Sequence, residues 1–179
     1  MKKRFLWVCA SLAAWTGMNI SSFNFVKAAE QEITQAQPPL EKQNLTIKTK
    51  TGKQQFFSIE IAKTPKEQEI GEMFRTEIPD DGGMLFIWPY PQSSSMWMKN
   101  TVVPLDIVFI DTNNHIQYIA ENTVPYSLAP INSLGTVKAT LELKGGITEK
   151  LGIMVGDTVE SLALQIPNGK QIIKNESKK

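Results

Sequence analysis

The sequence predicts a mainly β (α+β) domain: a small closed or partly open β-barrel of about seven short strands, with one short helix packed on it. Short apolar or alternating runs recur between residues 45 and 166, and turn residues such as Gly52 and Gly82-Gly83 separate them. One segment between the runs carries the signals of a helix start. No internal repeat is visible, and the length after a leader favours a single domain.

The first two strands are expected to pair as a hairpin. Apolar and polar side chains alternate over residues 45–49 and again over residues 57–61, which is the pattern of strands with one buried face. The turn between them is Thr51-Gly52-Lys53.

A short helix is expected to begin at Thr64. Thr64 is followed by Pro65 and Glu67, and a threonine, a proline and a glutamate at these positions form a capping box. Gly71 weakens the helix slightly. The buried face of this helix would consist of Ile70, Met73 and Phe74.

The later elements follow from the same reading of apolar runs and breakers. An apolar strand over residues 84–88 is expected to end at Pro89-Tyr90-Pro91, and Ser93-Ser94-Ser95 is expected to form a flexible loop. A one-turn helix over residues 148–151 should end at Gly152. Further strands are predicted over residues 96–98, 105–110, 116–120, 136–143 and 159–166.

The amino terminus predicts export across the cytoplasmic membrane, to the periplasm or the medium. A basic start (Lys2, Lys3 and Arg4) precedes an apolar run, and Val26-Lys27-Ala28 has small residues where a signal peptidase reads. Residues 1–28 are therefore expected to be a signal peptide. The alternative is an uncleaved anchor, which is disfavoured because the run of roughly 16 residues is shorter than the ~20 that span a bilayer.

The mature chain divides into three expected parts and is slightly acidic. Residues 29–43, rich in Gln, Glu and Pro, predict a flexible linker; residues 44–170 form the β-rich domain, and residues 171–179 a charged tail. Cleavage removes four basic residues and no acidic ones, which leaves 15 basic against 18 acidic residues and a net charge of −3. This balance disfavours nucleic acid as a partner, since such binding depends on neutralising phosphates.

Metal and cofactor chemistry is not expected. The single cysteine, Cys9, lies in the predicted leader, so the mature chain would have neither a disulfide nor a thiolate metal site. His115 is the only histidine, which disfavours a histidine metal site or a Ser-His-Asp triad.

Several motifs resemble, in order and spacing, the family called domain of unknown function 192. The resemblance covers about residues 45–164 and implies a compact, mainly β domain, often exported, without an assigned activity. The family usually has a leucine where this chain has Glu72, so a wholly buried helix end is not expected here. The motifs are Glu69-Ile70-Gly71-Glu72-Met73-Phe74-Arg75, Gly83-Met84-Leu85-Phe86, Met98-Lys99-Asn100-Thr101, Pro104-Leu105-Asp106, Leu141-Glu142-Leu143, Gly152-Ile153 and Gly156-Asp157.

A polar cluster interrupts the apolar run at residues 96–110. A turn before Pro104 would direct the ammonium, amide and hydroxyl groups of its Lys-Asn-Thr element to one place. The candidate ligand-binding residues are Arg75, Trp97, Lys99, Asn100, Thr101, Asp106 and Glu142.

Each candidate also has a structural explanation. Asn100 and Thr101 could bond only to backbone, while Asp106 pairs with Arg75 or Lys99. Glu142 points away from its two leucine neighbours, either to solvent or into a barrel mouth. Two further features stay open: Gly145-Gly146 before Thr148 could hold an anion or simply turn, and Trp88, Trp97, Met96 and Met98 could line a pocket or pack in the core.

Two functions of different classes remain. The favoured one is a non-catalytic binding or accessory module for a small molecule, with a pocket edged by Lys99, Asn100 and Asp106. The other is an envelope hydrolase that uses Asp106 and Lys99, with Asn100 as an oxyanion or substrate donor. A carboxylate pair drawn from Asp106, Glu142 and Asp157 could in principle serve glycoside hydrolysis, although nothing in their spacing requires it. Neither requires a cofactor or stable membrane insertion, and the sequence predicts no oligomeric state.

Overall fold

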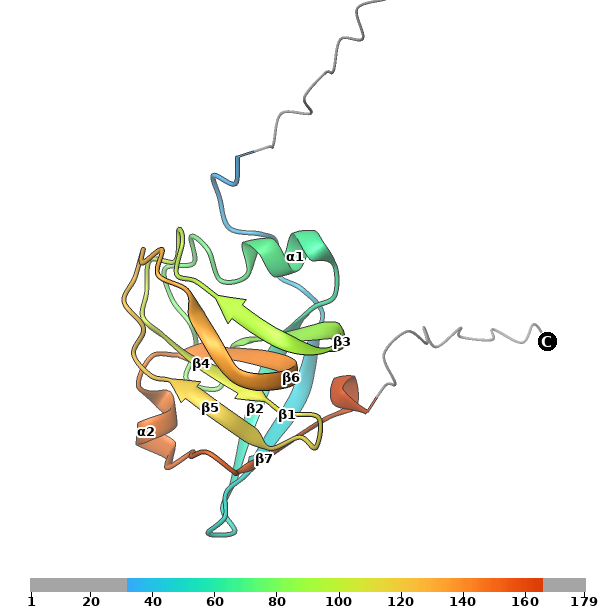
Figure 1. The fold of residues 1–179 in the computed structure, drawn as a ribbon. Helices are drawn as coiled ribbons and strands as arrows, with labels where there is room; N and C mark the ends of the chain where they lie inside the picture. Colours follow the sequence, from blue (N-terminus) through green and yellow to red (C-terminus); the bar gives the residue numbers. More distant parts are fainter. Residues whose placement is uncertain (1–31, 166–179) are drawn as a thin grey trace, which may run out of the picture. The chain divides into compact units, whose positions relative to one another are not determined.

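A computed structural model of the chain describes residues 32–165 (Figure 1). The predicted signal peptide and charged tail lie outside these residues. Along the described part the elements are β1 (Lys42–Lys48), β2 (Gln54–Ala62), α1 (Pro65–Ile70), β3 (Met84–Met96), β4 (Leu105–Ile110), β5 (Ile116–Ala120), β6 (Ile131–Lys144), α2 (Ile147–Leu151), β7 (Thr158–Ser161) and a 3-10 turn, η1 (Leu162–Leu164).

The seven strands form one mixed sheet that is nearly closed into a barrel, as the sequence predicts. Their order is β5-β4-β6-β3-β2-β1-β7. Neighbours are antiparallel except β2 and β3, which run parallel with Glu60 opposite Met84. A single bridge between His115 and Thr158 joins the two outer strands, and the Val159 N–H donates to Asn114 O at 2.8 Å across the same seam.

The core divides into two clusters on the two faces of β4. Val108 and Ile110 belong to the larger cluster, whereas Leu105, Ile107 and Phe109 belong to the smaller one. Because successive side chains of a strand point to opposite faces, a strand buried on both sides shows an unbroken apolar run. Asp106, in the middle of this run, is therefore also fully buried.

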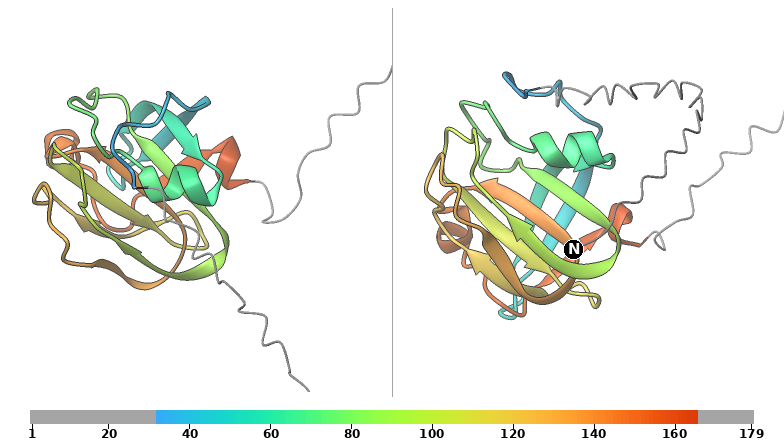
Figure 2. Two further views of the ribbon diagram at one scale, coloured as in Figure 1. Left: turned by 90° about the horizontal axis from the view of Figure 1, so that it is seen from above. Right: turned by 45° about the horizontal axis from the view of Figure 1, so that its top comes forward.

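Helix α1 begins as the capping box predicts. Glu67 N donates to Thr64 Oγ1 at 3.2 Å, and Thr64 N donates to Glu67 Oε2 at 2.8 Å. The helix lies at one end of the barrel, beside β3 (Figure 2), and Gln68 Nε2 links it there to Ile87 O at 3.0 Å. Met73 is buried as expected, while Ile70 and Phe74 are half-buried.

Strand β3 is longer than predicted and includes Ser93-Ser94-Ser95, so the prediction of a flexible loop there is wrong. Its pairing with β6 shifts between Ile87 and Gln92 and again between Ser93 and Ser95. Pro89 and Pro91 fall inside the first shift, where their missing N–H groups interrupt no ladder bond. The predicted strand at residues 96–98 is only the end of β3, and β7 stops at Ser161.

The segment predicted as a linker packs on the domain from Gln37 onward. Gln37 is only 9% exposed, and its Nε2 donates to Gly71 O at 3.0 Å and to Glu67 O at 3.2 Å. Both carbonyls belong to the carboxyl-terminal end of α1, where the carbonyl of Glu67 also accepts the Gly71 N–H at 2.9 Å. The Leu40 N–H donates to Glu60 Oε2 at 2.7 Å. A flexible linker was predicted from the composition of this segment, and composition does not reveal hydrogen bonds to residues far away in the sequence.

None of the helices within residues 32–165 has the length and hydropathy needed to cross a bilayer.

Candidate functional site

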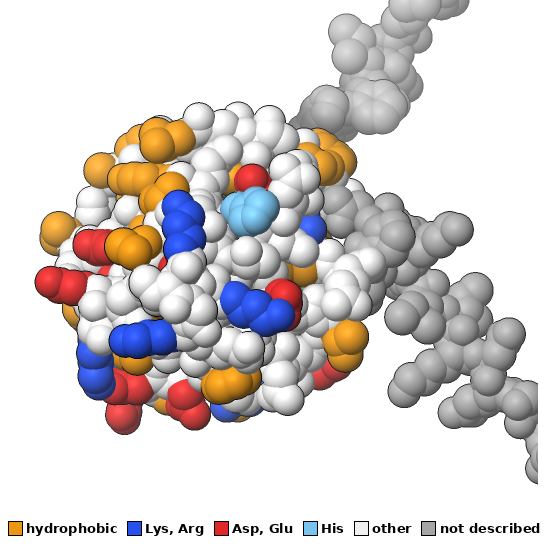
Figure 3. All heavy atoms as spheres, turned by 90° about the horizontal axis from the view of Figure 1, so that it is seen from below, with side chains coloured by type: hydrophobic (Ala, Val, Ile, Leu, Met, Phe, Trp, Pro, Cys, Tyr) orange, Lys and Arg blue, Asp and Glu red, His pale blue; other side chains and the backbone are white. Residues whose placement is uncertain are grey.

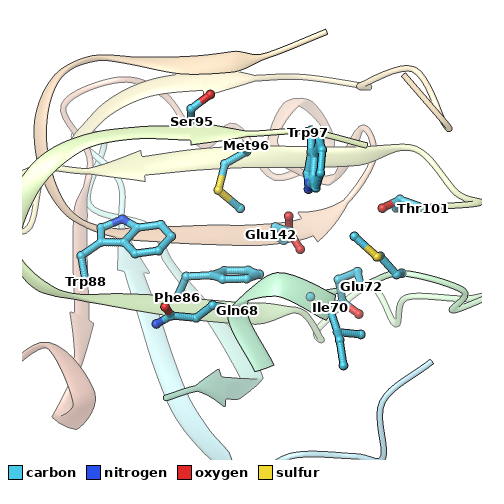
Figure 4. A pocket seen from close by; sticks show the side chains of 12 residues that line it. Gln68, Ile70, Glu72, Phe86, Trp88, Ser95, Met96, Trp97, Thr101 and Glu142 are labelled. Carbon is cyan, nitrogen blue, oxygen red and sulfur yellow. The ribbon is translucent and has the colours of Figure 1, made fainter. Parts of the chain in front are cut away.

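A cavity of about 110 Å³ opens between the end of α1, strands β3 and β6, and the segment that follows β3 (Figure 4). Its wall is mostly apolar and aromatic, with a small number of polar groups, which is the usual composition of a small-molecule site. The lining residues are Gln68, Ile70, Gly71, Glu72, Met73, Phe86, Trp88, Ser95, Met96, Trp97, Thr101 and Glu142.

The chain leaves α1 in a conformation that directs Glu72 into this cavity. Gly71 has φ +52°, and a Cβ placed there would lie 3.1 Å from Phe86 Cζ and 3.4 Å from Glu142 Oε2. Phe74, three residues later, has φ 62°. Positive φ is unfavourable for a bulky side chain, and here the Phe74 N–H donates to Asn100 O at 2.9 Å. The tight exit from α1 is thus fixed by contacts with both β3 and the segment after it.

Arg75 is held mainly by Glu60, on β2. Its two terminal nitrogens each lie 2.8 Å from a carboxylate oxygen of Glu60, in a bidentate pair. Burial alone would raise the pKa of Glu60, but the hydrogen bonds from Arg75 and from the Leu40 N–H outweigh it, so this pKa is lowered. Arg75 Nε also lies 3.0 Å from Glu72 Oε2.

Glu72 and Glu142 are two buried carboxyl groups that face the cavity. They are 2% and 5% exposed. Burial raises the pKa of Glu72 to about 7, although the nearby Arg75 charge opposes the rise. Burial, with the Glu72 charge added to it, raises the pKa of Glu142 well above its ordinary value. The helix end is not wholly buried, since Ile70 and Phe74 are half-buried, but Glu72 itself is a titratable group in a buried position.

Three oxygens of this pair accept no hydrogen bond from the described residues: Glu72 Oε1, Glu72 Oε2 and Glu142 Oε2. The contact of Glu72 Oε2 with Arg75 is an ion pair without hydrogen-bond geometry. The indole nitrogen of Trp88, also on the cavity wall, likewise lacks a partner there. In native proteins nearly all buried polar groups have a hydrogen-bond partner. Several buried groups without one therefore lie together on the wall of this cavity.

The structure brings four of the predicted site residues to this region. Trp97, Thr101 and Glu142 line the cavity, and Arg75 contacts it through Glu72. Lys99 and Asn100 are not lining residues: the Lys99 ammonium lies 5.0 Å from the centre of the exposed Trp97 ring, on its face. The Thr101 hydroxyl bonds only weakly, to Lys99 O at 3.4 Å.

Asp106 lies elsewhere, and the alternative in which it pairs with Arg75 or Lys99 is wrong. Its Oδ1 accepts the backbone N–H groups of Asn122 at 2.8 Å and Gly146 at 2.9 Å. Its Oδ2 accepts the N–H of Thr148 at 2.9 Å and the Thr148 hydroxyl at 2.7 Å. The anion held by the Gly145-Gly146 turn is therefore the chain's own carboxylate.

Asp157, the third member of the suggested glycosidase pair, also has a structural role. Its two oxygens accept the N–H groups of Lys50 at 2.9 Å and Met154 at 2.7 Å, and it is 1% exposed. A carboxylate whose oxygens are occupied in this way is not available to attack or protonate a substrate.

The turn at Asn100 is expected to be more sensitive to backbone conformation than to side-chain chemistry. Asn100 has φ 57°, a region that asparagine and glycine tolerate and alanine does not. Asn100→Ala should lower the free energy of unfolding by about 1 kcal/mol, and Asn100→Gly should change it by less than about 0.5 kcal/mol. Urea denaturation measures both, with exposed Lys99→Ala as the neutral control. A larger loss for Asn100→Gly than for Asn100→Ala would mean that the amide, not the backbone, matters.

Sequence reasoning missed Glu60, Glu72 and Gln68 as members of this region. Glu72 had a signal, because a glutamate replaces the leucine usual at this position of a buried helix end. Glu60 had none, since its alternation with Ile59 and Ile61 is equally typical of a solvent-facing strand position.

The described residues contain no group of three or more His, Cys, Asp or Glu side chains placed to hold a metal ion. His115 is exposed at the closing seam of the barrel. Figure 3, which views the domain from the side opposite α1, shows the histidine among mixed charged and apolar side chains.

Comparison with known proteins gives one family and several similar solved structures, two of which are described below. The model of the family DUF192, described as "Uncharacterized ACR", matches residues 46–161. A protein of Sinorhizobium meliloti 1021, described as a proposed transcription regulator, is 36% identical with a TM-score of 0.68, over 70% of this chain and 98% of its own. A protein of unknown function from Novosphingobium aromaticivorans DSM 12444 is 40% identical with a TM-score of 0.66, over 74% of this chain and 96% of its own. No curated protein matches.

Proposed function

The chain belongs to the DUF192 family, and we propose that in this protein the cavity between α1, β3 and β6 binds a small molecule without transforming it. The observation that carries the proposal is that three buried oxygens of Glu72 and Glu142 accept no hydrogen bond from the described residues, on the wall of a cavity that is partly apolar. A buried polar atom without a partner costs about 1–3 kcal/mol. Such a cost is typical of positions that serve a ligand rather than the fold.

Electrostatics supports the same place. Burial raises the pKa of Glu72 to about 7 and that of Glu142 well above its ordinary value, and both groups line one cavity. Strongly perturbed titratable groups in a cleft mark candidate functional sites. Phe86, Trp88 and Met96 supply the apolar wall against which the body of a ligand would pack.

The site that we propose differs from the one predicted from the sequence, whereas the compartment that we propose is the same. The pocket moves from Lys99, Asn100 and Asp106 to Glu72 and Glu142. The compartment stays as predicted: an exported protein with its leader removed near Ala28, supported by the basic, apolar and small-residue order of that leader.

We propose no nucleic-acid partner, although the Sinorhizobium protein is described as a proposed transcription regulator. The cavity carries carboxyl groups, which repel phosphate, and the expected mature chain has more acidic than basic residues.

A second candidate function is acid–base hydrolysis at the same cavity. The observation that favours it is that two carboxyl groups with raised pKa values face the same cavity. A carboxyl that titrates near 7 can act as a base beside a neutral carboxylic acid. The version that uses Asp106 and Lys99 has lost its support, because the oxygens of Asp106 are already occupied.

Native mass spectrometry of the protein purified from the periplasm or medium tests the binding proposal. We expect a chain that begins near Ala29 and a reproducible extra mass. Ser95→Trp should remove that mass, because Ser95 is an exposed lining residue whose hydroxyl points away from the interior of the cavity (Figure 4), so an indole there does not disturb the core and can fold over the cavity from outside.

Ser93→Trp is the matched control, since Ser93 is exposed on the same strand but does not line the cavity. Retention of the extra mass by Ser95→Trp, or its loss from both variants, would contradict the assignment of the ligand to this cavity. Recovery of a chain that still begins at Met1 would contradict cleavage of the leader.

A further inference from the structure

The cavity region contains more carboxyl groups than cations. Glu60, Glu72 and Glu142 surround a single guanidinium, that of Arg75. Both terminal nitrogens of Arg75 are already bound to Glu60, which leaves only its Nε near Glu72. If Glu72 and Glu142 ionise together, the region carries an uncompensated negative charge in a buried setting, which is unfavourable unless a cation enters.

The carboxyl oxygens that accept no hydrogen bond match the donors of an ammonium group. Glu72 Oε1, Glu72 Oε2 and Glu142 Oε2 are buried and have no hydrogen-bond partner among the described residues. An alkylammonium ion carries three N–H donors and no acceptor. Figure 4 shows the carboxyl groups of Glu72 and Glu142 reaching the cavity from two different elements, α1's end and β6.

The aromatic wall does not favour a quaternary ammonium ion held by Trp97. The Lys99 ammonium already lies on the face of that ring, at 5.0 Å from its centre, so cation–π binding at this ring is in use and a second cation on it would be repelled. A ligand held by the carboxylates must instead donate N–H groups, while its apolar part faces Phe86, Trp88 and Met96.

Building on the proposed function, we infer that the cavity takes a small organic cation: a primary ammonium group bound by Glu72 and Glu142, on a short apolar stem. The negative charge of the carboxylates favours a cation, their oxygens favour a group with several N–H donors, and the apolar wall favours an apolar stem. The volume of about 110 Å³ keeps the stem short.

Titration of the full purified protein with n-butylammonium chloride near pH 8 tests the inference, followed by calorimetry or by the indole N–H signals of the tryptophans. We expect saturable binding. The neutral isostere 1-butanol, which lacks the charge, and tetramethylammonium, which lacks N–H donors, should each bind at least about tenfold more weakly.

Two variants connect the binding to the named carboxyl groups. Glu72→Gln and Glu142→Gln keep the shape of the side chain but remove its charge, and each should weaken n-butylammonium binding at least about tenfold. Glu69→Gln is the matched control on α1, because its side chain is 46% exposed and pairs only with Lys66 in this structure; its affinity should stay within about twofold of the original. Circular dichroism confirms that all three remain folded.

The outcomes separate this inference from the binding proposal. Equal affinity for 1-butanol and n-butylammonium, or unchanged affinity in both glutamine variants, would overturn the ammonium inference. A retained mass that Ser95→Trp removes, combined with no binding of n-butylammonium, would also overturn it but leave the cavity as a binding site for a neutral molecule. Absence of both a retained mass and alkylammonium binding would overturn both proposals.

Discussion

Asp106→Ala is expected to lower the free energy of unfolding by about 4 kcal/mol, the largest effect of any single substitution considered. The carboxylate is fully buried and accepts hydrogen bonds from Asn122, Gly146 and both donors of Thr148. Its removal leaves those donors buried without a partner and releases the start of α2 and the loop after β5 from β4. Urea denaturation monitored by tryptophan fluorescence measures the loss.

Asp111→Ala provides the comparison, because Asp111 also accepts two backbone N–H groups but at an exposed hairpin turn. Its cost should be about 1 kcal/mol. Asp106→Asn should fall between the two, since the amide keeps one acceptor and replaces the other with a donor facing donors. A cost for Asp106→Ala below that of Asp111→Ala would mean that the buried donors find water or other partners.

Glu72→Gln is expected to stabilise the unliganded protein by about 3 kcal/mol near pH 8 and to change its stability little near pH 4. The pKa of Glu72 rises from 4.5 to about 7 on folding, chiefly through burial. The folded state therefore binds this proton more tightly than the unfolded state does. The stabilising contribution is complete below 4.5 and is lost as the pH rises to about 7. Glutamine cannot ionise and avoids this loss.

Unfolding free energies of Glu72→Gln and the unmodified chain, measured between about pH 4 and pH 8, test this expectation. Glu69→Gln is again the control and should add no new pH dependence in this range. Glu60 acts in the opposite sense: its pKa is lowered, so its contribution is present above 4.5 and is lost as the pH falls through the lowered value. Parallel curves for Glu72→Gln and the unmodified chain would contradict a buried, titrating Glu72.

The two expectations for Glu72 separate stability from function. The substitution that should strengthen the fold is the one that should weaken ammonium binding. Such opposition is typical of groups retained for a ligand at a cost to the fold. For Asp106 no such opposition is expected, because its oxygens serve only the chain.

Local signals predicted the elements of the fold well. The capping box at Thr64 and the glycine end of α2 at Gly152 depend on neighbouring residues alone, and the strand over residues 105–110 is recognisable because it is apolar on both faces. The extension of β3 through Pro89 and Pro91 was not predictable in the same way. Whether a proline breaks a strand depends on the register of its partner, here β6, which lies about 45 residues away.

The site was predicted only in part, for the same physical reason. The sequence identified Arg75, Trp97, Thr101 and Glu142 as polar or aromatic groups in unusual settings, and these lie at or beside the cavity. The partner of each charged group was not predictable, because it is set by contacts distant in sequence: Asp106 binds Thr148, 42 residues away, and Arg75 binds Glu60, 15 residues away.

The segment before β1 holds residues of the cavity region in place, although it contributes no lining residue. Gln37 fixes the carbonyl of Gly71, the residue that turns Glu72 inward, and the Leu40 N–H helps to hold Glu60 in the charged form that occupies Arg75. A chain that begins at Asn44 would keep every strand residue from that point onward but would lose the hydrogen bonds of Gln37 and Leu40. Glu60 would then compete less well for Arg75, more of the guanidinium charge would reach Glu72, and the preference of the cavity for a cation would fall.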